Sequence, residues 1–387
     1  MRLARTLLWA AVLSWPCLAP AQESSWSLAR AEASLEGVAD VRETRWTSTR
    51  PPGGAYDRIE LHRYRSVAPR AAVLLYLPGT NMNGEVAVTD ESHNLWLFLA
   101  RRGVEVYALD YRTRFVPSAG VDDFGFMRHW GSQAFLGDVR AAAEQARRES
   151  GAGRLFVAGF SRGVFFAYAL AAAEPGGVAG LIALDGYFKN HAPKDGYDLP
   201  AEKARIEASA AWASDVSGRL GWEKRRALME AAAANPAGPA TDAKFGTIGV
   251  QLADILYNAW RPGGLANAVE GLSRPEVLAR LLAGYDRYYP TLQDVEGRSI
   301  ADRDDDPATP IDDAWGETDV PVLYFGSTGM GADWLMNGIY SASRSGAQDV
   351  TLNVLERYGH LDVLVGENAR REVFEPTLVW IAKRHAR

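Results

Sequence analysis

The hydrophobic positions of the chain fall into short strand-like stretches, and from residue 72 onward these alternate with helical patterns. Residues 41–46 and 59–64 read as two strands around the turn-forming Pro51–Gly54, which predicts an antiparallel edge. Continuous apolar runs then predict strands at 72–77, 104–109, 155–158, 179–184, 320–325 and 350–355. Helices are predicted at 95–102 and 135–148, after Ser161, and from about Pro376 to the end. Continuous apolar strands that alternate with helices indicate a mostly parallel sheet with helices on both faces.

The pattern changes between about residues 187 and 315. There the strand signal disappears and Ala-rich helical segments take over, with the aromatic residues Trp212, Trp222, Tyr257, Trp260, Tyr285, Tyr288 and Tyr289. An insertion placed between two strands of a parallel sheet lies over the carboxyl ends of the strands. We therefore interpret residues 22–186 and 317–387 as an α/β core and residues 187–316 as a helical cap. Most of the aromatics would form the cap's own core, and a subset would line a pocket.

The first 21 residues have the pattern of a secretory signal peptide. Arg2 and Arg5 precede an apolar run over residues 7–18, and Ala19-Pro20-Ala21 is an A-x-A cleavage site. The run is short for a membrane span and contains Pro16, so we expect no stable membrane insertion of the mature chain. Cys17 is the only cysteine, and it would be removed with the peptide. The mature protein, secreted or periplasmic, would then have no disulfide and no thiol chemistry.

Composition and charge restrict the class of ligand. The 47% of hydrophobic residues is ample for a sizeable core. The formal net charge of −6 becomes −8 when Arg2 and Arg5 are removed. Nucleic-acid binding requires clustered lysine and arginine to neutralise phosphates, so we expect no nucleic acid as partner.

The strongest candidate for chemistry is Ser161. The run L-F-V-A-G-F-S-R-G over residues 155–163 leads a buried strand directly into G-x-S-x-G, and a helix is predicted after it. This is the context of a nucleophile elbow, a sharp turn that lifts a serine hydroxyl above the sheet. Gly159 and Gly163 leave room for the crowded backbone of the turn.

A serine nucleophile requires a base and an acid. Of the six histidines, only His360 lies just past a late strand, where such a base is expected, whereas His62 and His385 are expected to be solvated. For the acid we favour Asp333, in the loop after the strand at 320–325. Asp185, at the end of the strand at 179–184, is the rival. Asp362 is too near His360 in sequence to orient its ring, and we interpret it as an anchor of the loop.

Acyl transfer also needs donors for the oxyanion. We expect the backbone N–H groups of Arg162 and Thr80 to supply them, because Arg162 follows the nucleophile and Thr80 lies in the loop after the strand at 72–77. The side chain of Arg162 is expected to form a structural ion pair.

With these parts in place the chain resembles the α/β-hydrolases over nearly all of the mature sequence except the cap. Four segments are similar to the acid-lipase-like and esterase branch, namely 94–100, 103–107, 333–335 and 360–362. The resemblance implies a triad of Ser161, Asp333 and His360 and the hydrolysis of esters. Pro78 stands where many members have histidine, and the cap has no segment that matches, so the resemblance leaves the substrate open.

We therefore expect a secreted serine hydrolase of the esterase or lipase type that acts on a small apolar ester through an acyl-enzyme. One alternative is a serine peptidase or amidase of the same fold, which would need a carboxylate pair in the cap for a substrate amine. The other is a catalytically silent binding module on this fold. We expect no cofactor and no metal, because the acidic run at residues 302–306 lacks the glycine and the distal glutamate of an EF-hand loop.

Overall fold

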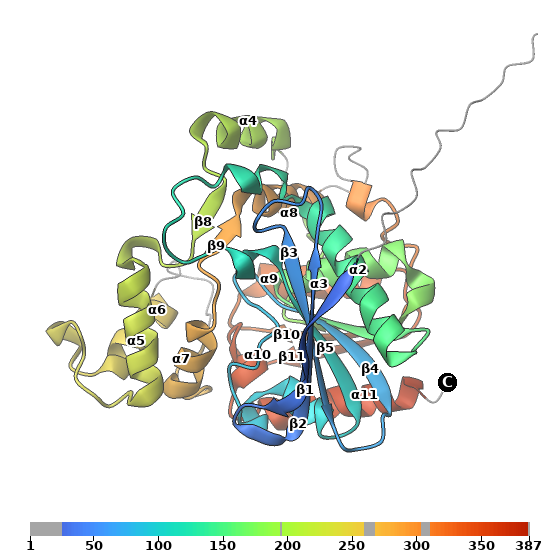
Figure 1. Cartoon of the computed structure of the whole chain (residues 1–387), viewed down its shortest axis with the longest axis horizontal. Coiled ribbons are helices and arrows are strands. Elements are labelled where there is room, and N and C mark those ends of the chain that lie inside the picture. Colours follow the sequence, from blue (N-terminus) through green and yellow to red (C-terminus); the bar gives the residue numbers. More distant parts are fainter. Residues whose placement is uncertain (1–24, 194–195, 259–267, 303–309, 386–387) are drawn as a thin grey trace, which may run out of the picture.

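The computed structural model describes residues 25–193, 196–258, 268–302 and 310–385. The predicted signal peptide with Cys17, Trp260, and most of the acidic run at 302–306 lie outside these ranges. In the described residues nine strands form one sheet in the order β1-β2-β3-β5-β4-β6-β7-β10-β11 (Figure 1). The strands are β1 Trp26–Leu35, β2 Val38–Thr49, β3 Arg58–Ser66, β4 Ala72–Leu77, β5 Val104–Asp110, β6 Leu155–Phe160, β7 Val178–Leu184, β10 Val322–Ser327 and β11 Val350–Leu355.

In this order, each pair of neighbours from β1 to β5 is antiparallel. Each pair from β5 and β4 to the far edge at β11 is parallel. The antiparallel edge was predicted, but it has a third strand, β1, that the sequence pattern did not predict. Most residues of β1 are exposed, so the strand carries no apolar alternation by which it could be recognised. The predicted α/β fold, with a mostly parallel sheet between helices, is confirmed.

Helices cover both faces of the sheet. They are α1 Leu95–Ala100, α2 Ser132–Ser150, α3 Arg162–Ala173, α9 Ala332–Arg344, α10 Asp362–Val365 and α11 Glu375–His385. Helices α2, α3 and α9 pack into the core on one face, and α1 and α11 into the core on the other. The side of α2 that the spacing predicted, with Phe135, Val139, Ala142, Ala143 and Ala146, is fully buried.

The segment between β7 and β10 contains α4 Leu199–Ser209, β8 Ala213–Asp215, α5 Trp222–Ala234, α6 Ile248–Asn258, α7 Pro275–Ala283, β9 Tyr288–Pro290 and α8 Thr291–Asp302. It is mainly helical, as expected, but β8 and β9 form a small antiparallel sheet. Strands of three residues are too short to give a periodic signal. Helices α5, α6 and α7 gather beside the main sheet in Figure 1, where they pack against one another.

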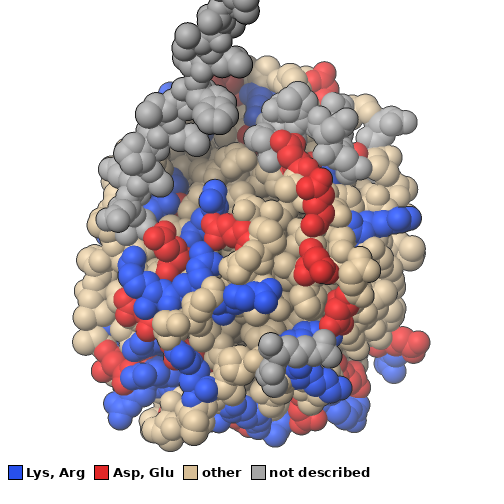
Figure 2. All heavy atoms as spheres, turned by 90° about the vertical axis from the view of Figure 1, so that its right-hand side faces the viewer, with Lys and Arg blue, Asp and Glu red and all other residues tan. Residues whose placement is uncertain are grey.

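The surface opposite to these helices carries both kinds of charge. Figure 2 shows lysine and arginine interspersed with aspartate and glutamate on that face. Within the described residues no helix is both long and apolar enough to cross a membrane.

The register of the sheet determines which loops meet above it. Phe160 of β6 pairs with Leu184 of β7, and Leu184 pairs with Phe325 of β10. The residues that follow continue this pairing, since Ser161 N–H donates to the Leu184 carbonyl at 3.0 Å and Asp185 N–H to the Phe325 carbonyl at 2.8 Å. The turns that begin at Ser161 and Asp185 therefore lie side by side at the carboxyl edge.

Candidate active site

Ser161 occupies a strained turn between β6 and α3. Its φ of 54° and ψ of −119° lie in a region that residues other than glycine rarely adopt. A Cβ on Gly159 would come within 2.3 Å of the Gly163 carbonyl oxygen, and one on Gly163 within 1.9 Å of the Leu77 carbonyl oxygen. Only glycine fits at both positions, as the sequence predicted. Such strain, of order 1–3 kcal/mol, is typical of functional sites.

His360 is held by a carboxylate from the neighbouring strand. Its Nδ1 lies 2.6 Å from Oδ2 of Asp185, a residue that is completely buried at the end of β7. An ionised carboxylate only accepts, so Nδ1 carries the hydrogen and Nε2 is left as the basic nitrogen. Ser327 donates to the same carboxylate twice, from its N–H to Oδ1 at 2.7 Å and from its hydroxyl to Oδ2 at 2.9 Å. These bonds fix the orientation of Asp185 and, through it, of the imidazole.

The prediction that Asp333 is the partner of His360 is therefore wrong for this structure, and the rival Asp185 takes that place. Strand β10 runs on to Ser327, and the following turn places Asp333 in the first turn of α9, where it is exposed. The sequence did contain a signal for Asp185, because it directly follows the strand that neighbours the nucleophile strand.

Other groups position the His360 ring and its loop. Asp362 is buried, and its Oδ2 accepts the N–H of Gly359 at 2.8 Å and that of Val269 at 2.8 Å. The interpretation of Asp362 as an anchor of the loop is confirmed, and the anchor reaches the segment before α7. Phe160 stacks on the imidazole at 4.5 Å between ring centroids, and Trp334 meets it edge-on at 5.3 Å.

The two expected oxyanion donors flank Ser161. Arg162 is the first residue of α3, and the N–H groups of a first helical turn have no partner within the helix. Thr80 lies in the loop after β4, which packs so closely on the elbow that a Cβ on Gly79 would come within 3.0 Å of Ser161 Cβ. The Arg162 side chain forms an ion pair with Asp294 of α8 at 3.1 Å, which confirms its expected structural role.

Two cavities meet at Ser161, and Thr80 and Trp334 also line both. One, of about 620 Å³, contains His360 and is mainly apolar, with Met229, Ile255 and Leu282 from helices α5, α6 and α7. The other, of about 750 Å³, carries the charged residues Arg162, Asp294, Arg298 and Asp302. Of the cap aromatics named from the sequence, Tyr285 lines the apolar cavity. The arrangement can hold a ligand with one apolar and one polar part across the serine.

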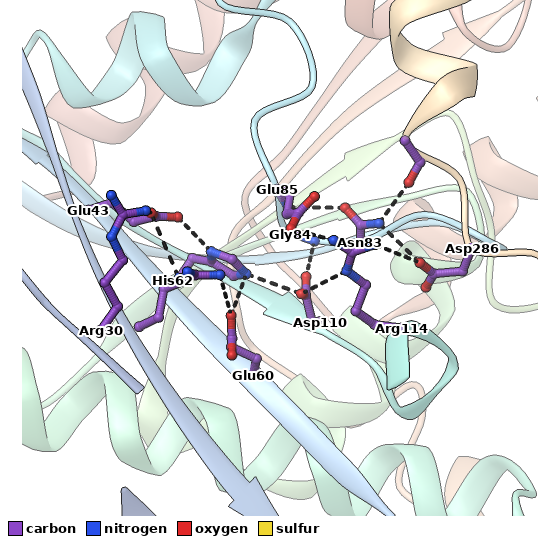
Figure 3. Close-up of polar contacts among 12 residues, drawn as sticks. Arg30, Glu43, Glu60, His62, Asn83, Gly84, Glu85, Asp110, Arg114 and Asp286 are labelled. Atoms are coloured by element: carbon purple, nitrogen blue, oxygen red, sulfur yellow. Dashed lines mark hydrogen bonds and ion pairs between the residues drawn. The ribbon is translucent and has the colours of Figure 1, made fainter. Parts of the chain in front are cut away.

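A second polar cluster lies on strands β2, β3 and β5 of the sheet (Figure 3). His62, expected to be solvated, is fully buried on β3, and its two ring nitrogens lie 2.9 Å from Glu43 and 3.1 Å from Asp110. Although burial opposes the charged form, Asp110 and the other carboxylates raise the pKa of His62 to about 10. Expecting solvation was therefore wrong, because β3 lies inside the sheet between β2 and β5 and the side chains on both of its faces are buried around His62.

The same cluster extends to the loop after β4 and to Asp286, which lies between α7 and β9. Asp110 accepts the N–H of Gly84 at 2.6 Å, and Asn83 donates to Asp286 at 3.1 Å (Figure 3). Burial, with the nearby Asp110, raises the pKa of Asp286 to about 7. Among the described residues, Glu60, His62 and Asp110 present ligand atoms within 4.8 Å of one another. A metal there would have to displace the proton that His62 holds at neutral pH.

Comparison with solved structures found several chains that are similar to this one, and the first agrees with the fold over most of its length. A candidate lipase from Sulfolobus solfataricus is 26% identical to this chain, with a TM-score of 0.75 over 93% of this chain and 99% of that one. A monoacylglycerol lipase from Paleococcus ferrophilus is 14% identical, with a TM-score of 0.48 over 84% and 99%. A soluble variant of monoglyceride lipase from Saccharomyces cerevisiae is 12% identical, with a TM-score of 0.49 over 94% and 97%. No protein-family model and no curated protein matches the sequence. The chain has the α/β-hydrolase fold, as its motifs predicted.

Proposed function

We propose that this protein is a serine hydrolase that cleaves carboxylic esters, with Ser161 as nucleophile, His360 as general base and Asp185 as the acid. The observation that carries the proposal is the 2.6 Å contact between His360 Nδ1 and buried Asp185, because His360 lines the same cavity as Ser161. The likeness to the candidate lipase supports a hydrolase on this fold.

In the proposed mechanism, His360 Nε2 takes the Ser161 proton as Oγ attacks the ester carbonyl. The N–H groups of Thr80 and Arg162 stabilise the oxyanion. His360 then gives its proton to the leaving alcohol, and the acyl group stays on Ser161. A water deprotonated by His360 hydrolyses this acyl-enzyme, while Asp185 stabilises the imidazolium in both steps.

The two cavities favour an ester with unlike arms. Apolar side chains line most of one cavity, so one arm is apolar, and the charged residues of the other suit a polar group. A peptidase would need free carboxylates for a substrate amine. Asp294 is already bound by Arg162 at 3.1 Å and by Arg298 at 2.7 Å, so it does not favour that alternative.

The test is the hydrolysis of aryl esters from acetate to palmitate. We expect Ser161→Ala and His360→Ala each to lose turnover to a similar degree, on the order of 10⁶-fold as in a serine protease triad, because triad members act as a unit. The double variant should be no worse than either single one. Exposed Ser209 supplies the matched control, since Ser209→Ala should keep full activity. Turnover that persists in His360→Ala would rule out this base.

Secretion remains part of the proposal and rests on the sequence of residues 1–21. The mature protein should begin at Gln22 and contain no thiol. Intact-mass measurement of protein recovered from the periplasm or the medium tests this, and a retained Cys17 would contradict it.

A further inference from the structure

The apolar cavity contains one cationic side chain from the cap. Arg225 of α5 lines the cavity together with Met229, Ile255 and Leu282, whereas Ser161 and His360 line it from the core. Arg225 is only 8% exposed. A guanidinium is always charged and has five N–H donors, so its burial in such surroundings requires an acceptor.

Within the described residues, no hydrogen bond from the Arg225 side chain and no ion pair to it is formed. Its guanidinium carbon lies 5.7 Å from the centre of the Tyr285 ring, a cation–π contact that accepts no hydrogen bond in the plane of the guanidinium. Asp215 attracts it weakly, but that carboxylate is already bound by Arg287 at 2.9 Å. Burial accordingly lowers the pKa of Arg225.

Another buried arginine of the chain shows what a structural role looks like. Arg112, 2% exposed, donates to Asp138 at 2.6 and 2.8 Å and to Asp57 at 2.7 Å. Buried charges in proteins are normally paired in this way. The acceptor for Arg225 would thus come from the molecule that fills the cavity.

We propose that Arg225 binds a carboxylate carried by the substrate, so that the enzyme prefers esters whose apolar arm bears an anionic end. This inference rests on the proposed ester hydrolysis and defines its substrate class. Arginine and carboxylate form bidentate hydrogen bonds that are stronger than neutral ones. A phosphate dianion would call for further cations, and Arg225 and His360 are the only basic residues among the described residues that line this cavity.

The preference is measured as a ratio of kcat/KM values. For the acyl arm, 4-nitrophenyl monoesters of linear dicarboxylic acids from adipic to sebacic acid are compared with 4-nitrophenyl alkanoates of equal length. For the alcohol arm, acetates of ω-hydroxy acids are compared with acetates of n-alkanols. In one of these series the wild type should favour the carboxylate. Arg225→Met should reduce that ratio by roughly 10–100-fold, the value of a hydrogen bond to a charged group.

Arg226 gives a matched control on the same helix. It is 53% exposed and pairs with Glu223 and Glu230, so Arg226→Met should leave the ratio unchanged. Arg225→Lys keeps the charge but not the fork of donors, and should retain part of the preference. If Arg225→Met changes kcat/KM for both substrates of a pair by the same factor in both series, Arg225 affects only the shape of the cavity and the inference is overturned.

A binding measurement separates this inference from the proposed function. In the Ser161→Ala background, suberate should raise the melting temperature, and the added Arg225→Met change should abolish that shift. If no ester is hydrolysed but this shift is seen, ester hydrolysis fails and the carboxylate site stands. If esters are hydrolysed but Arg225→Met alters neither the kcat/KM ratio nor the melting-temperature shift with suberate, the carboxylate site fails and the proposed function stands.

The stability of the variant gives a further readout. Replacing a buried cation that lacks an acceptor with an apolar side chain of similar length is neutral or stabilising, in contrast to breaking a buried ion pair. Arg225→Met should therefore melt at or above the wild-type temperature in the absence of ligand. A marked fall, with the substrate ratio unchanged, would assign Arg225 to the structure of the cap.

Discussion

Asp185 and His360 are 175 residues apart in the chain, yet their side chains meet at 2.6 Å. Asp185 is completely buried and receives two further hydrogen bonds from Ser327. The imidazole therefore has one orientation and one tautomer, with its basic nitrogen free for chemistry.

This contact separates the two candidate acids by experiment. Asp185→Asn should lose turnover by about 10⁴-fold, the loss that the equivalent change causes in a serine protease triad, because the imidazole can take the wrong tautomer. Asp333→Asn, at an exposed position in the first turn of α9, should stay within a few-fold of wild type. Both are measured on one substrate at one pH, with circular dichroism to show that the fold is kept. A nearly active Asp185→Asn would remove Asp185 from the mechanism.

Ser327 should act as a positioning residue through Asp185. Ser327→Ala removes the 2.9 Å hydroxyl bond but keeps the N–H bond at 2.7 Å. Since a hydrogen bond to a charged group contributes about 1.5–3 kcal/mol, we expect a loss of roughly 10–100-fold in kcat with little change in KM. Ser327→Thr keeps a hydroxyl and should recover much of the rate. A rise in KM of similar size would indicate a general disturbance of the pocket instead.

The loop after β4 gives a test of the oxyanion donors. Gly79→Ala would place a methyl group 3.0 Å from Ser161 Cβ and 3.2 Å from the Phe160 carbonyl oxygen, so the elbow and the loop must move apart by a few tenths of an ångström, which would displace the Thr80 N–H from Ser161. Loss of one such donor costs about 10²–10³-fold in kcat. Thr80→Ala retains the backbone N–H and serves as control, with a far smaller effect. Equal activity of Gly79→Ala and wild type would place the second donor elsewhere.

The buried His62 cluster predicts how stability depends on pH. The folded-state pKa of His62, about 10, lies above the ordinary value of 6.5. The contribution of protonated His62 to the free energy of unfolding is therefore fully present below pH 6.5 and is lost as the pH rises through 10. The free energy of unfolding should fall over that range by up to about 1.4 kcal/mol per pH unit. His62→Gln leaves buried carboxylates without their cation and should cost about 3–5 kcal/mol near neutral pH.

Denaturant unfolding of wild type and His62→Gln between pH 6 and 10 measures both effects. The difference in stability between the two proteins should be greatest at the acidic end and shrink toward pH 10. His385→Gln, exposed at the end of α11, is the control and should follow the wild type. A difference that grows with pH would mean that His62 is buried in its neutral form.

The sequence alone determined the features that depend on neighbouring residues. The elbow at Ser161 follows from its glycines, because a strained turn between a buried strand and a helix is a local event. The buried face of α2 follows from helical spacing, and the place of His360 just after the last strand from chain order. The tertiary structure decided which distant groups meet. Asp185 faces His360 because Leu184 pairs with both Phe160 and Phe325 in the sheet, and no local pattern encodes that register. The tertiary structure also decided that His62 is buried in its charged form and that Arg225 is buried, since both depend on which groups pack around the side chain.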